Sequence, residues 1–463
     1  MFYISTRGSA PALAFDEVLL AGLASDGGLY VPSAWPQVSS VEQVELINLN
    51  YSDLACRLMF PFVGDSIAED DFAEIVSASY SEFTNDQVAP LKKLVDGVWL
   101  LELFHGPTLA FKDIALQLLG RLFDYILTRR GERITIVGAT SGDTGSAAIE
   151  ACKGRQSVDI FILHPAGRVS DVQRRQMTTV SSENVYNIAI NGTFDDCQDL
   201  VKACFNDLHF RERVNLSAVN SINWARIMAQ IVYYFWAGLK LGAPDQGATF
   251  IVPTGNFGNI FAGYGAHLMG LPVKKLVVAS NQNDILVRFF KKNEMVMEPV
   301  VPTVSPSMDI QVSSNFERLL FDLLGRKSGD VSEAMHNFRK TGKLVVPNFA
   351  WKEARKLFDA RKVDDNTTLR TIAKISSEQN VLIDPHTAIG IETAFEMSSK
   401  LSRPIVSLAT AHPAKFPNAA KKAVGQIPAL PPSLSDLYER KENFTVLPNE
   451  LDILQDFICA KKY

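Results

Sequence analysis

The chain has 463 residues, of which 47% are apolar, and this is enough for a large buried core and for two or three domains. Its net charge of -5 gives no basic surplus that would attract phosphate backbones, so no nucleic-acid partner is expected. No signal peptide is visible, and the longest near-apolar stretch, residues 227–239, falls short of the roughly 20 residues that cross a bilayer. We therefore expect a cytoplasmic protein without a membrane partner.

Five cysteines are scattered along the sequence without a CxxC pair. This pattern indicates free thiols in a reducing compartment and no metal site of the zinc-knuckle kind. Cys197 and Cys204 are seven residues apart, share one face of a helix and are expected to fill the core.

Residues 1–92 are expected to form a first unit. Helical patterns occur in VEQVELINLNYSDLACRLMF (41–60) and DDFAEIVSASYSEF (70–83), with turns rich in Gly, Pro and Ser between them. No catalytic constellation is visible in this unit.

From Val98 onward, short β-branched runs alternate with helical patterns. These runs are VWLLELF (98–104), RITIVGA (133–139), VDIFILHP (158–165), NVYNIAI (184–190), ATFIVPTG (248–255), KKLVVAS (274–280) and RPIVSLATA (403–411). Repeated βα units of this kind predict an α/β fold with mostly parallel sheet covered on both faces. We assign residues 93–430 to a catalytic α/β region, with a helical insertion at about 284–380, and residues 431–463 to a C-terminal extension without a usable motif.

In open α/β sheets, ligands bind beyond the carboxyl ends of the strands, so the loops at these ends are the candidate sites. GATSGDTGS (138–146) opens a helix with small residues, and the hydroxyls of Thr140, Ser141 and Thr144 add donors to its exposed N–H groups. A P-loop needs a lysine after its second glycine, and this loop has none, so nucleoside triphosphates are disfavoured. A tight turn with capping Ser and Thr is the alternative interpretation.

Three other loops follow the same logic. PTGNFGNIFAG (253–263) follows a strand and opens a helix, which suits a phosphate bound by backbone N–H groups. In SINWARIMAQ (221–230), the planar guanidinium of Arg226 could bind a second dianionic group. The alternative is that this segment is a helix cap followed by an arginine on the surface. In LATAHPAKF (408–416), Thr410 and His412 lie at the end of a strand that points to the same crevice. The alternative is that both residues have only a structural role.

Lys112, in FHGPTLAFKDI (104–114), follows a strand at the same edge of the predicted sheet. A lysine alone is usually a solvated surface charge. A lysine amine beside a helix end that binds phosphate is, however, the arrangement that pyridoxal phosphate requires. Burial would lower the pKa of the lysine and favour the neutral amine that reacts with the aldehyde and abstracts protons.

The motifs FHGPTLAFKD, ATSGDTGSAA, NSINWARI and PTGNFGN, in this order, resemble the threonine synthase family of the bacterial and fungal type. This family belongs to the fold-type II pyridoxal-phosphate enzymes, which are similar to the tryptophan synthase β subunit. The amino-terminal ISTRG and SDGGLYVP add to the resemblance, which covers roughly residues 3–425. It implies two parallel-sheet α/β domains, an extra N-terminal domain, and conversion of O-phospho-L-homoserine and water to L-threonine and phosphate. A monomer or homodimer is expected, although the sequence does not give the oligomeric state.

The resemblance also implies roles for individual residues. Lys112 would bind the cofactor aldehyde covalently, and Thr410 would face the pyridine nitrogen. The cofactor phosphate would be held by Gly255, Asn256, Phe257, Gly258 and Asn259; the substrate α-carboxylate by Thr140, Ser141, Asp143 and Thr144; and the substrate phosphate by Ser221, Asn223 and Arg226.

Asp143 departs from the asparagine that is common in fold-type II enzymes. Because a carboxylate repels another carboxylate, Asp143 is expected to turn away, to be protonated, or to contact the cofactor hydroxyl or a backbone donor. His105, His386 and His412 are expected to be structural, with His105 the best acid–base candidate because it is near Lys112.

Two other functions remain open at this point. One is a related phospho-lyase or amino-acid dehydratase that releases a 2-keto acid, and the other is a non-catalytic protein that binds an amino-acid phosphate on the same scaffold. The product distinguishes the first from a synthase. A binding protein would retain its ligand after Lys112→Ala.

Overall fold

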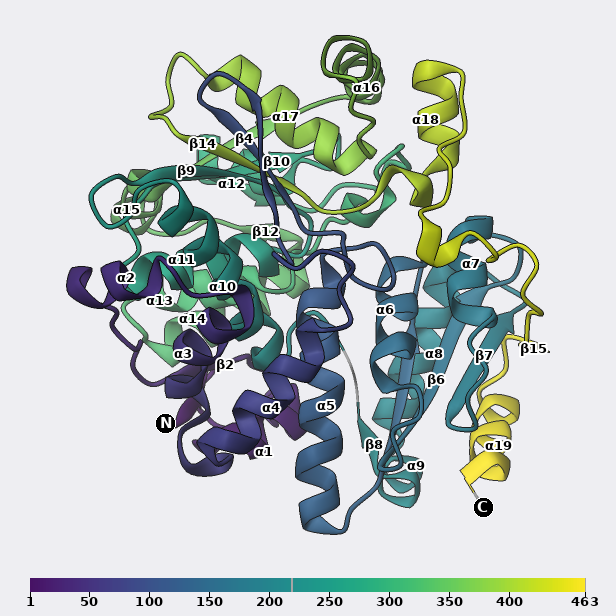
Figure 1. Cartoon of the computed structure of the whole chain (residues 1–463). Helices are drawn as coiled ribbons and strands as arrows, with labels where there is room; N and C mark the ends of the chain where they lie inside the picture. Colours follow the sequence, from purple (N-terminus) through teal and green to yellow (C-terminus); the bar gives the residue numbers. More distant parts are fainter. Residues whose placement is uncertain (218–219, 463) are drawn as a thin grey trace.

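Two sheets organise the chain, whose computed structural model describes residues 1–217 and 220–462 (Figure 1). In the larger sheet the strand order is β13-β10-β9-β14-β4-β3; among its described strand pairs, β3 and β4 are antiparallel and the others are parallel. The strands are β3 Leu91–Val95, β4 Val98–Glu102, β9 Ala248–Pro253, β10 Val273–Ser280, β13 Phe358–Lys362 and β14 Ile405–Ala409. The strands predicted near residues 98, 248, 274 and 405 are therefore confirmed.

The smaller sheet has the order β15-β7-β6-β5-β8 and is parallel throughout its described pairs. Its strands are β5 Ile134–Ala139, β6 Val158–Pro165, β7 Val185–Ile190, β8 Leu216–Ser217 and β15 Thr445–Leu447. β6 is buried along its whole length, as expected for a strand covered on both faces. Two parallel-sheet α/β domains confirm the predicted fold class.

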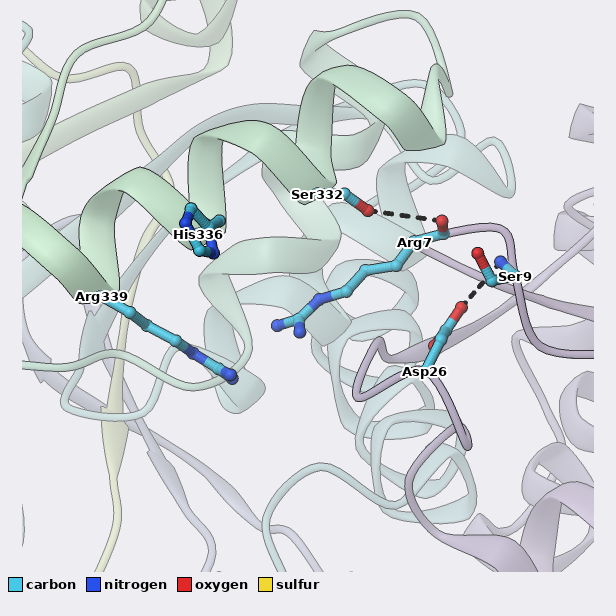
Figure 2. A pocket seen from close by; sticks show the side chains of 6 residues that line it. All are labelled: Arg7, Ser9, Asp26, Ser332, His336 and Arg339. Atoms are coloured by element: carbon cyan, nitrogen blue, oxygen red, sulfur yellow. Dashed lines mark hydrogen bonds between the residues drawn. The ribbon is translucent and has the colours of Figure 1, made fainter.

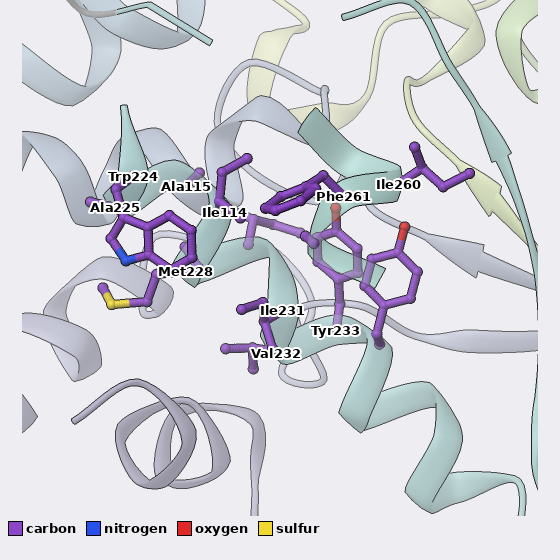
Figure 3. Packing of buried hydrophobic residues seen from close by; sticks show 14 of the residues in the cluster. Ile114, Ala115, Trp224, Ala225, Met228, Ile231, Val232, Tyr233, Ile260 and Phe261 are labelled. Carbon is purple, nitrogen blue, oxygen red and sulfur yellow. The ribbon is translucent and has the colours of Figure 1, made fainter. Parts of the chain in front are cut away.

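Helices follow the strands of both sheets. They are α5 Lys112–Arg130, α6 Asp143–Cys152, α7 Asp171–Thr178, α8 Phe194–Asn206, α9 Leu208–Val214, α10 Trp224–Lys240, α11 Gly258–Leu268, α17 Pro385–Met397 and α18 Pro417–Val424. Figure 3 shows Trp224 and Met228 of α10 in one apolar cluster with Ile114 of α5 and Phe261 of α11. The helices that begin at the candidate loops thus share one core, which fixes their starting points relative to one another.

The N-terminal residues form β1 Tyr3–Ser5, α1 Phe15–Ala21, β2 Tyr30–Pro32, α2 Ser40–Leu46, α3 Tyr51–Val63, η1 Gly64–Ser66 and α4 Glu69–Tyr80. The helical pattern at 41–60 is divided between α2 and α3, because the side chain of Asn50 accepts from the Asp53 N–H and starts a new helix. The apolar residues of this unit belong to the same buried cluster as α5 and α10. It therefore packs directly on the helices that carry the candidate site.

The interval at 284–380 is mostly helical, as predicted, but it also supplies a strand. It contains α12 Ile285–Lys292, β11 Met295–Val296, η2 Pro306–Met308, α13 Phe316–Leu323, α14 Ser328–Thr341, β12 Lys343–Leu344, α15 Asn348–Leu357 and α16 Asp365–Gln379, in addition to β13. β13 pairs in parallel with β10 at the edge of the larger sheet. The insertion is thereby tied to the catalytic region by backbone hydrogen bonds.

The C-terminal residues complete the smaller sheet. After η3 Pro413–Lys415 and η4 Pro432–Leu434, β15 pairs with β7, and α19 Leu451–Lys462 packs near α8. Leu454 and Ile458 join Cys197 and Cys204 in one buried cluster, so the two thiols fill the core as expected. Within the described residues, no helix is long and apolar enough to cross a membrane.

Candidate active site

Lys112 is the first residue of α5, and the segment before it is fixed against the end of β14. The Phe111 N–H donates to the Thr410 carbonyl at 2.9 Å, and the His412 N–H donates to the Leu109 carbonyl at 3.0 Å. Leu109 has a φ of 63°, so the chain turns sharply before the helix begins. These contacts bring Lys112 and Thr410 together from loops that are about 300 residues apart in the sequence.

The side chain of Lys112 is only 11% exposed, and its Nζ lies 3.2 Å from Asp143 Oδ2. The surface-charge interpretation of this lysine is therefore wrong. Burial lowers the pKa of Lys112; Asp143 opposes this shift, while the nearby cations Lys415 and Arg226 reinforce it. The net lowering favours a neutral amine, as a lysine nucleophile requires.

Asp143, at the start of α6, is bound on both of its oxygens. Oδ2 faces Lys112 and accepts from Ser307 Oγ at 3.3 Å, while Oδ1 accepts from Gln173 Nε2 at 2.8 Å and lies 3.1 Å from Lys415 Nζ. Burial would raise the pKa of Asp143, but its contacts with Lys112, Lys415 and Gln173 hold it well below its usual range. The lowered pKa favours the ionised carboxylate, and the contacts of Asp143 are to side-chain donors rather than to backbone N–H groups.

Lys415 is a second buried lysine of the site that sequence reasoning missed. Its side chain is 0% exposed, and Nζ donates to the Thr108 carbonyl at 2.6 Å and to Gln176 Oε1 at 2.9 Å, in addition to facing Asp143. The sequence feature that could have identified Lys415 is its place in the loop after β14, five residues beyond Thr410.

The predicted carboxylate-binding loop is closed by one of its own side chains. Thr140 Oγ1 accepts from the Gly142 N–H at 3.0 Å and from the Gly145 N–H at 2.9 Å, and thereby caps the start of α6. Ser141 is exposed and Thr144 is half-buried. Of these predicted ligands, Asp143 is the one with a described contact to Lys112.

The loop at 253–263 has the geometry of an anion cradle. Phe257 adopts the left-handed conformation with a φ of 63°, and α11 starts at Gly258, so the first N–H groups of the helix have no partner within it. A Cβ added at Gly255 would lie 3.0 Å from the Ser307 carbonyl oxygen, so close packing favours glycine there. The Asn259 Oδ1 accepts from Tyr233 and Tyr234 on α10, while its Nδ2 has no hydrogen-bond partner among the described residues, so a side-chain donor of Asn259 is available to an anion in addition to the backbone N–H groups of the helix start.

Arg226, in the first turn of α10, is 3% exposed, and its Nε and Nη1 have no hydrogen-bond partner in the described part of the chain. Burial lowers the pKa of this guanidinium to about 10. A buried cation without an anion is costly, so the position favours an anionic ligand. Ser221 Oγ lies 3.3 Å from Ser314 Oγ, which in turn lies 3.3 Å from Asn256 Oδ1, so the two predicted anion loops are neighbours.

Asn223 has a structural part in this arrangement. Its Oδ1 accepts from the Ala225 N–H at 3.0 Å and starts α10, while Nδ2 donates to the Leu19 carbonyl at 2.8 Å. Asn223 thus links the Arg226 loop to the N-terminal unit.

Among the three histidines of the sequence prediction, His386 is connected to the candidate site. Its Nδ1 pairs with Asp384 Oδ1 at 2.8 Å, and its Nε2 accepts from the Ser307 N–H at 3.3 Å. His105, the favoured candidate from the sequence, instead pairs with Glu102 at 2.8 Å. His412 Nδ1 accepts from the Ala414 N–H at 3.2 Å.

A separate cavity of about 320 Å³ lies between the N-terminal segment and α14 (Figure 2). Its lining residues are Arg7, Ser9, Asp26, Ser332, His336 and Arg339, none of which belongs to the predicted site. Arg7 is already bound there in a bidentate ion pair with Glu317, at 3.0 and 2.9 Å. The cavity marks the junction of the N-terminal unit with the insertion.

Three family models match consecutive parts of the chain: "Threonine synthase N terminus" at residues 2–80, "Pyridoxal-phosphate dependent enzyme" at 86–337, and "Threonine synthase, C-terminal" at 387–458. The threonine synthase of Pseudomonas aeruginosa is 60% identical over 459 residues, which cover 99% of this chain and 98% of that one. The chain belongs to the threonine synthase family. Its cofactor is pyridoxal phosphate.

Solved structures give the same result for the fold. Threonine synthase from Brucella melitensis with bound PLP superposes with a TM-score of 0.97 at 52% identity, covering 100% of this chain and 99% of that one. The yeast threonine synthase has a TM-score of 0.95 at 40% identity, with coverage of 100% and 98%. Threonine synthase-like 2 from Homo sapiens is more distant, at 34% identity over 96% of this chain and 94% of that one.

Proposed function

We propose that the chain converts O-phospho-L-homoserine and water to L-threonine and phosphate, the last step of threonine biosynthesis. Its family membership supports this reaction over the lyase alternative. The observation that carries the proposal is Arg226, a buried guanidinium whose Nε and Nη1 have no hydrogen-bond partner among the described residues and which is close enough to Lys112 to lower its pKa. A phosphorylated amino acid would supply the missing anion while its amino group reaches the lysine site.

The residues present fit pyridoxal phosphate. Lys112 would hold the cofactor aldehyde, the start of α11 with residues 255–259 would bind its phosphate, and Thr410 would face the pyridine nitrogen with a neutral hydroxyl. When bound, the cofactor supplies an electron sink that acidifies the C–H bonds of the substrate. With a neutral hydroxyl at Thr410, the cofactor ring would be less electron-withdrawing than it is beside a carboxylate, so proton removal depends strongly on the placement of Lys112.

Lys112 Nζ is the proposed acid–base group. Its burial favours the free amine, which takes the proton from the substrate Cα and then moves protons at Cβ while the γ-phosphate leaves. Ser141, Thr144 and the N–H groups at the start of α6 would bind the substrate α-carboxylate, with Thr140 holding that loop in shape. Asp143 would orient Lys112, since its carboxylate contacts that amine directly.

The phosphate of the substrate would be held by Arg226 and Ser221, with Asn223 fixing their loop. After the carbon–oxygen bond breaks, the phosphate remains in this site and is placed to act as a base for the water that adds at Cβ. Retaining the leaving group thus contributes to the second half of the reaction.

A single assay tests the proposal. The purified protein is loaded with pyridoxal phosphate, its absorbance spectrum is recorded, and O-phospho-L-homoserine is added while threonine, phosphate and 2-oxobutanoate are measured together. Equal amounts of threonine and phosphate are expected. Phosphate with 2-oxobutanoate would assign the chain to the lyases, and ligand binding without a cofactor absorbance band would indicate a binding protein.

The cellular setting is also part of the proposal. The cysteines at 56, 152, 197, 204 and 459 are free thiols, which supports a reducing, cytoplasmic compartment. A monomer or homodimer is expected, and light scattering of the purified protein would distinguish the two.

A further inference from the structure

Asn315, immediately before α13, joins the two loops that are proposed to hold phosphates. Its Nδ2 donates to the Ser221 carbonyl at 3.1 Å and to the Asn256 carbonyl at 3.0 Å. Its backbone N–H donates to the same Asn256 carbonyl at 3.0 Å. The side chain is 0% exposed, so one buried amide fixes the substrate-phosphate loop and the cofactor-phosphate loop to a common point.

Arg318, one turn along α13, sets the orientation of this amide. Its Nη1 donates to Asn315 Oδ1, its Nε to the Tyr30 carbonyl at 3.0 Å, and its Nη2 to the Ile222 carbonyl at 2.5 Å. Because the Asn315 oxygen faces a guanidinium, its NH₂ group must face the two loops. Arg318 is 0% exposed, so these donors lie in the protein interior.

The neighbours of Asn315 hold the same two loops. Ser313 Oγ donates to the Gly255 carbonyl at 2.7 Å, and Ser314 Oγ lies between Ser221 and Asn256. On the other side of α13, Glu317 accepts from Thr6 and Arg7, which anchors the helix to the N-terminal unit. The start of α13 therefore holds both loops through several contacts, and the Asn315 amide donates directly to a backbone carbonyl of each loop.

We propose that Asn315, oriented by Arg318, is a positioning residue that fixes the separation of the two phosphate sites and so selects the chain length of the phosphorylated amino acid. The inference rests on the proposed function, because the substrate must reach from the Lys112 site to Arg226 and Ser221. A displacement of about 1 Å at a positioning contact costs on the order of a hundredfold in rate. One methylene in a fitted site discriminates by roughly 10- to 200-fold.

The test compares two competitive inhibitors of the loaded enzyme. 2-Amino-5-phosphonopentanoate has the length of O-phospho-L-homoserine, and 2-amino-4-phosphonobutanoate is one methylene shorter. Asn315→Asp keeps an oxygen for Arg318 but places another oxygen against the two loop carbonyls, which pushes the loops apart. Asn315→Ser is the milder change, because the shorter side chain loses the hydrogen bonds to the two loop carbonyls without placing an oxygen against them.

Asn184→Asp is the matched control. Asn184 is also a buried amide, and its Nδ2 donates to the carbonyls of Cys152, Arg155 and Val158 at 2.8, 3.1 and 2.7 Å, at the amino end of the smaller sheet. We expect the native enzyme to prefer the longer inhibitor by about tenfold or more. Both Asn315 variants should reduce this ratio at least fivefold, whereas Asn184→Asp should lower stability and leave the ratio unchanged.

A purely structural role for Asn315 would weaken both inhibitors equally, so an unchanged ratio in either folded variant would overturn the inference. A native enzyme that binds both lengths alike would overturn it as well. If the native enzyme makes no threonine from O-phospho-L-homoserine, the proposed function fails first and the inference fails with it. If the native enzyme produces threonine normally but the inhibitor ratio is unchanged in the Asn315 variants, the inference about Asn315 is rejected and the proposed function stands.

Discussion

Asp143 and Lys415 form a buried ion pair on the carboxylate oxygen that faces away from Lys112. The Nζ of Lys415 is 3.1 Å from Oδ1, while Lys112 lies 3.2 Å from Oδ2. With Lys112 as a neutral amine, the charges of Asp143 and Lys415 cancel. This balance explains how an aspartate can occupy a position where an asparagine is common among fold-type II enzymes, and it reduces the cost of burying the carboxylate.

Lys415→Met should raise the pKa of Lys112. The Lys415 cation lowers that pKa in the native enzyme, and its removal leaves Asp143 to stabilise the protonated Lys112 alone. A higher pKa means less free amine at a given pH, so the pH profile for cofactor attachment to the apoenzyme should move upward by on the order of one pH unit. The rate is measured by absorbance from pH 6 to 10. The exposed Lys421→Met serves as a control, and coincident profiles would refute the assignment.

Asp143→Asn should destabilise the fold by about 3–5 kcal/mol at pH 7, because Lys415 is left as a buried cation without its anion. The folded-state pKa of Asp143 is depressed, so its stabilising contribution is complete above the unfolded pKa of about 3.9 and is lost as the pH falls below it. The free energy of unfolding, measured in urea, should consequently fall less steeply in acid for the variant than for the native protein. Parallel curves would contradict an ionised Asp143.

Arg226→Leu should separate activity from stability. Turnover of O-phospho-L-homoserine should fall by about a hundredfold or more, while occupancy by the cofactor changes little, because Arg226 is assigned to the substrate phosphate. The ligand-free variant should unfold at the same or a higher temperature, since an unpaired buried cation has been removed. If cofactor occupancy and turnover fall equally, Arg226 would have to be assigned to the cofactor site instead of the substrate phosphate.

Lys112→Ala should abolish turnover and leave no lysine adduct after borohydride treatment. Its stability should remain within about 1 kcal/mol of the native value, because Asp143 and Lys415 still balance each other. Peptide mapping of the trapped native enzyme checks the attachment point. An adduct on Lys415 would reverse the roles assigned to the two lysines.

The order of elements was predictable from the sequence because buried parallel strands and their helices leave strong local patterns. β13 was not predicted, since only Phe358 and Ala360 of FDARK are buried at the edge of the sheet and its other residues are polar or charged. The division of residues 41–60 into two helices depended on a cap at Asn50, which the apolar periodicity does not reveal.

For the site, the sequence predicted which loops meet but not which side chains complete them. Lys112 was found because it stands at a helix start after a candidate strand, and Arg226 because its planar fork lies near a helix start. Lys415, Ser307 and Asn315 reach the site through contacts that span tens to hundreds of residues, and local patterns carry no record of such contacts. Thr140 was predicted as a ligand, although its oxygen caps its own loop, because the same residue type serves both purposes.

The place of β15 in the smaller sheet has a consequence for biosynthesis. β5 to β8 are translated between residues 134 and 217, yet the exposed edge of β7 is covered only when residues 445–447 have left the ribosome. During that interval an unpaired strand edge is open to other nascent chains. Slow translation of the second half of the message should therefore increase aggregation of this protein, and faster elongation or a chaperone that shields β7 should reduce it.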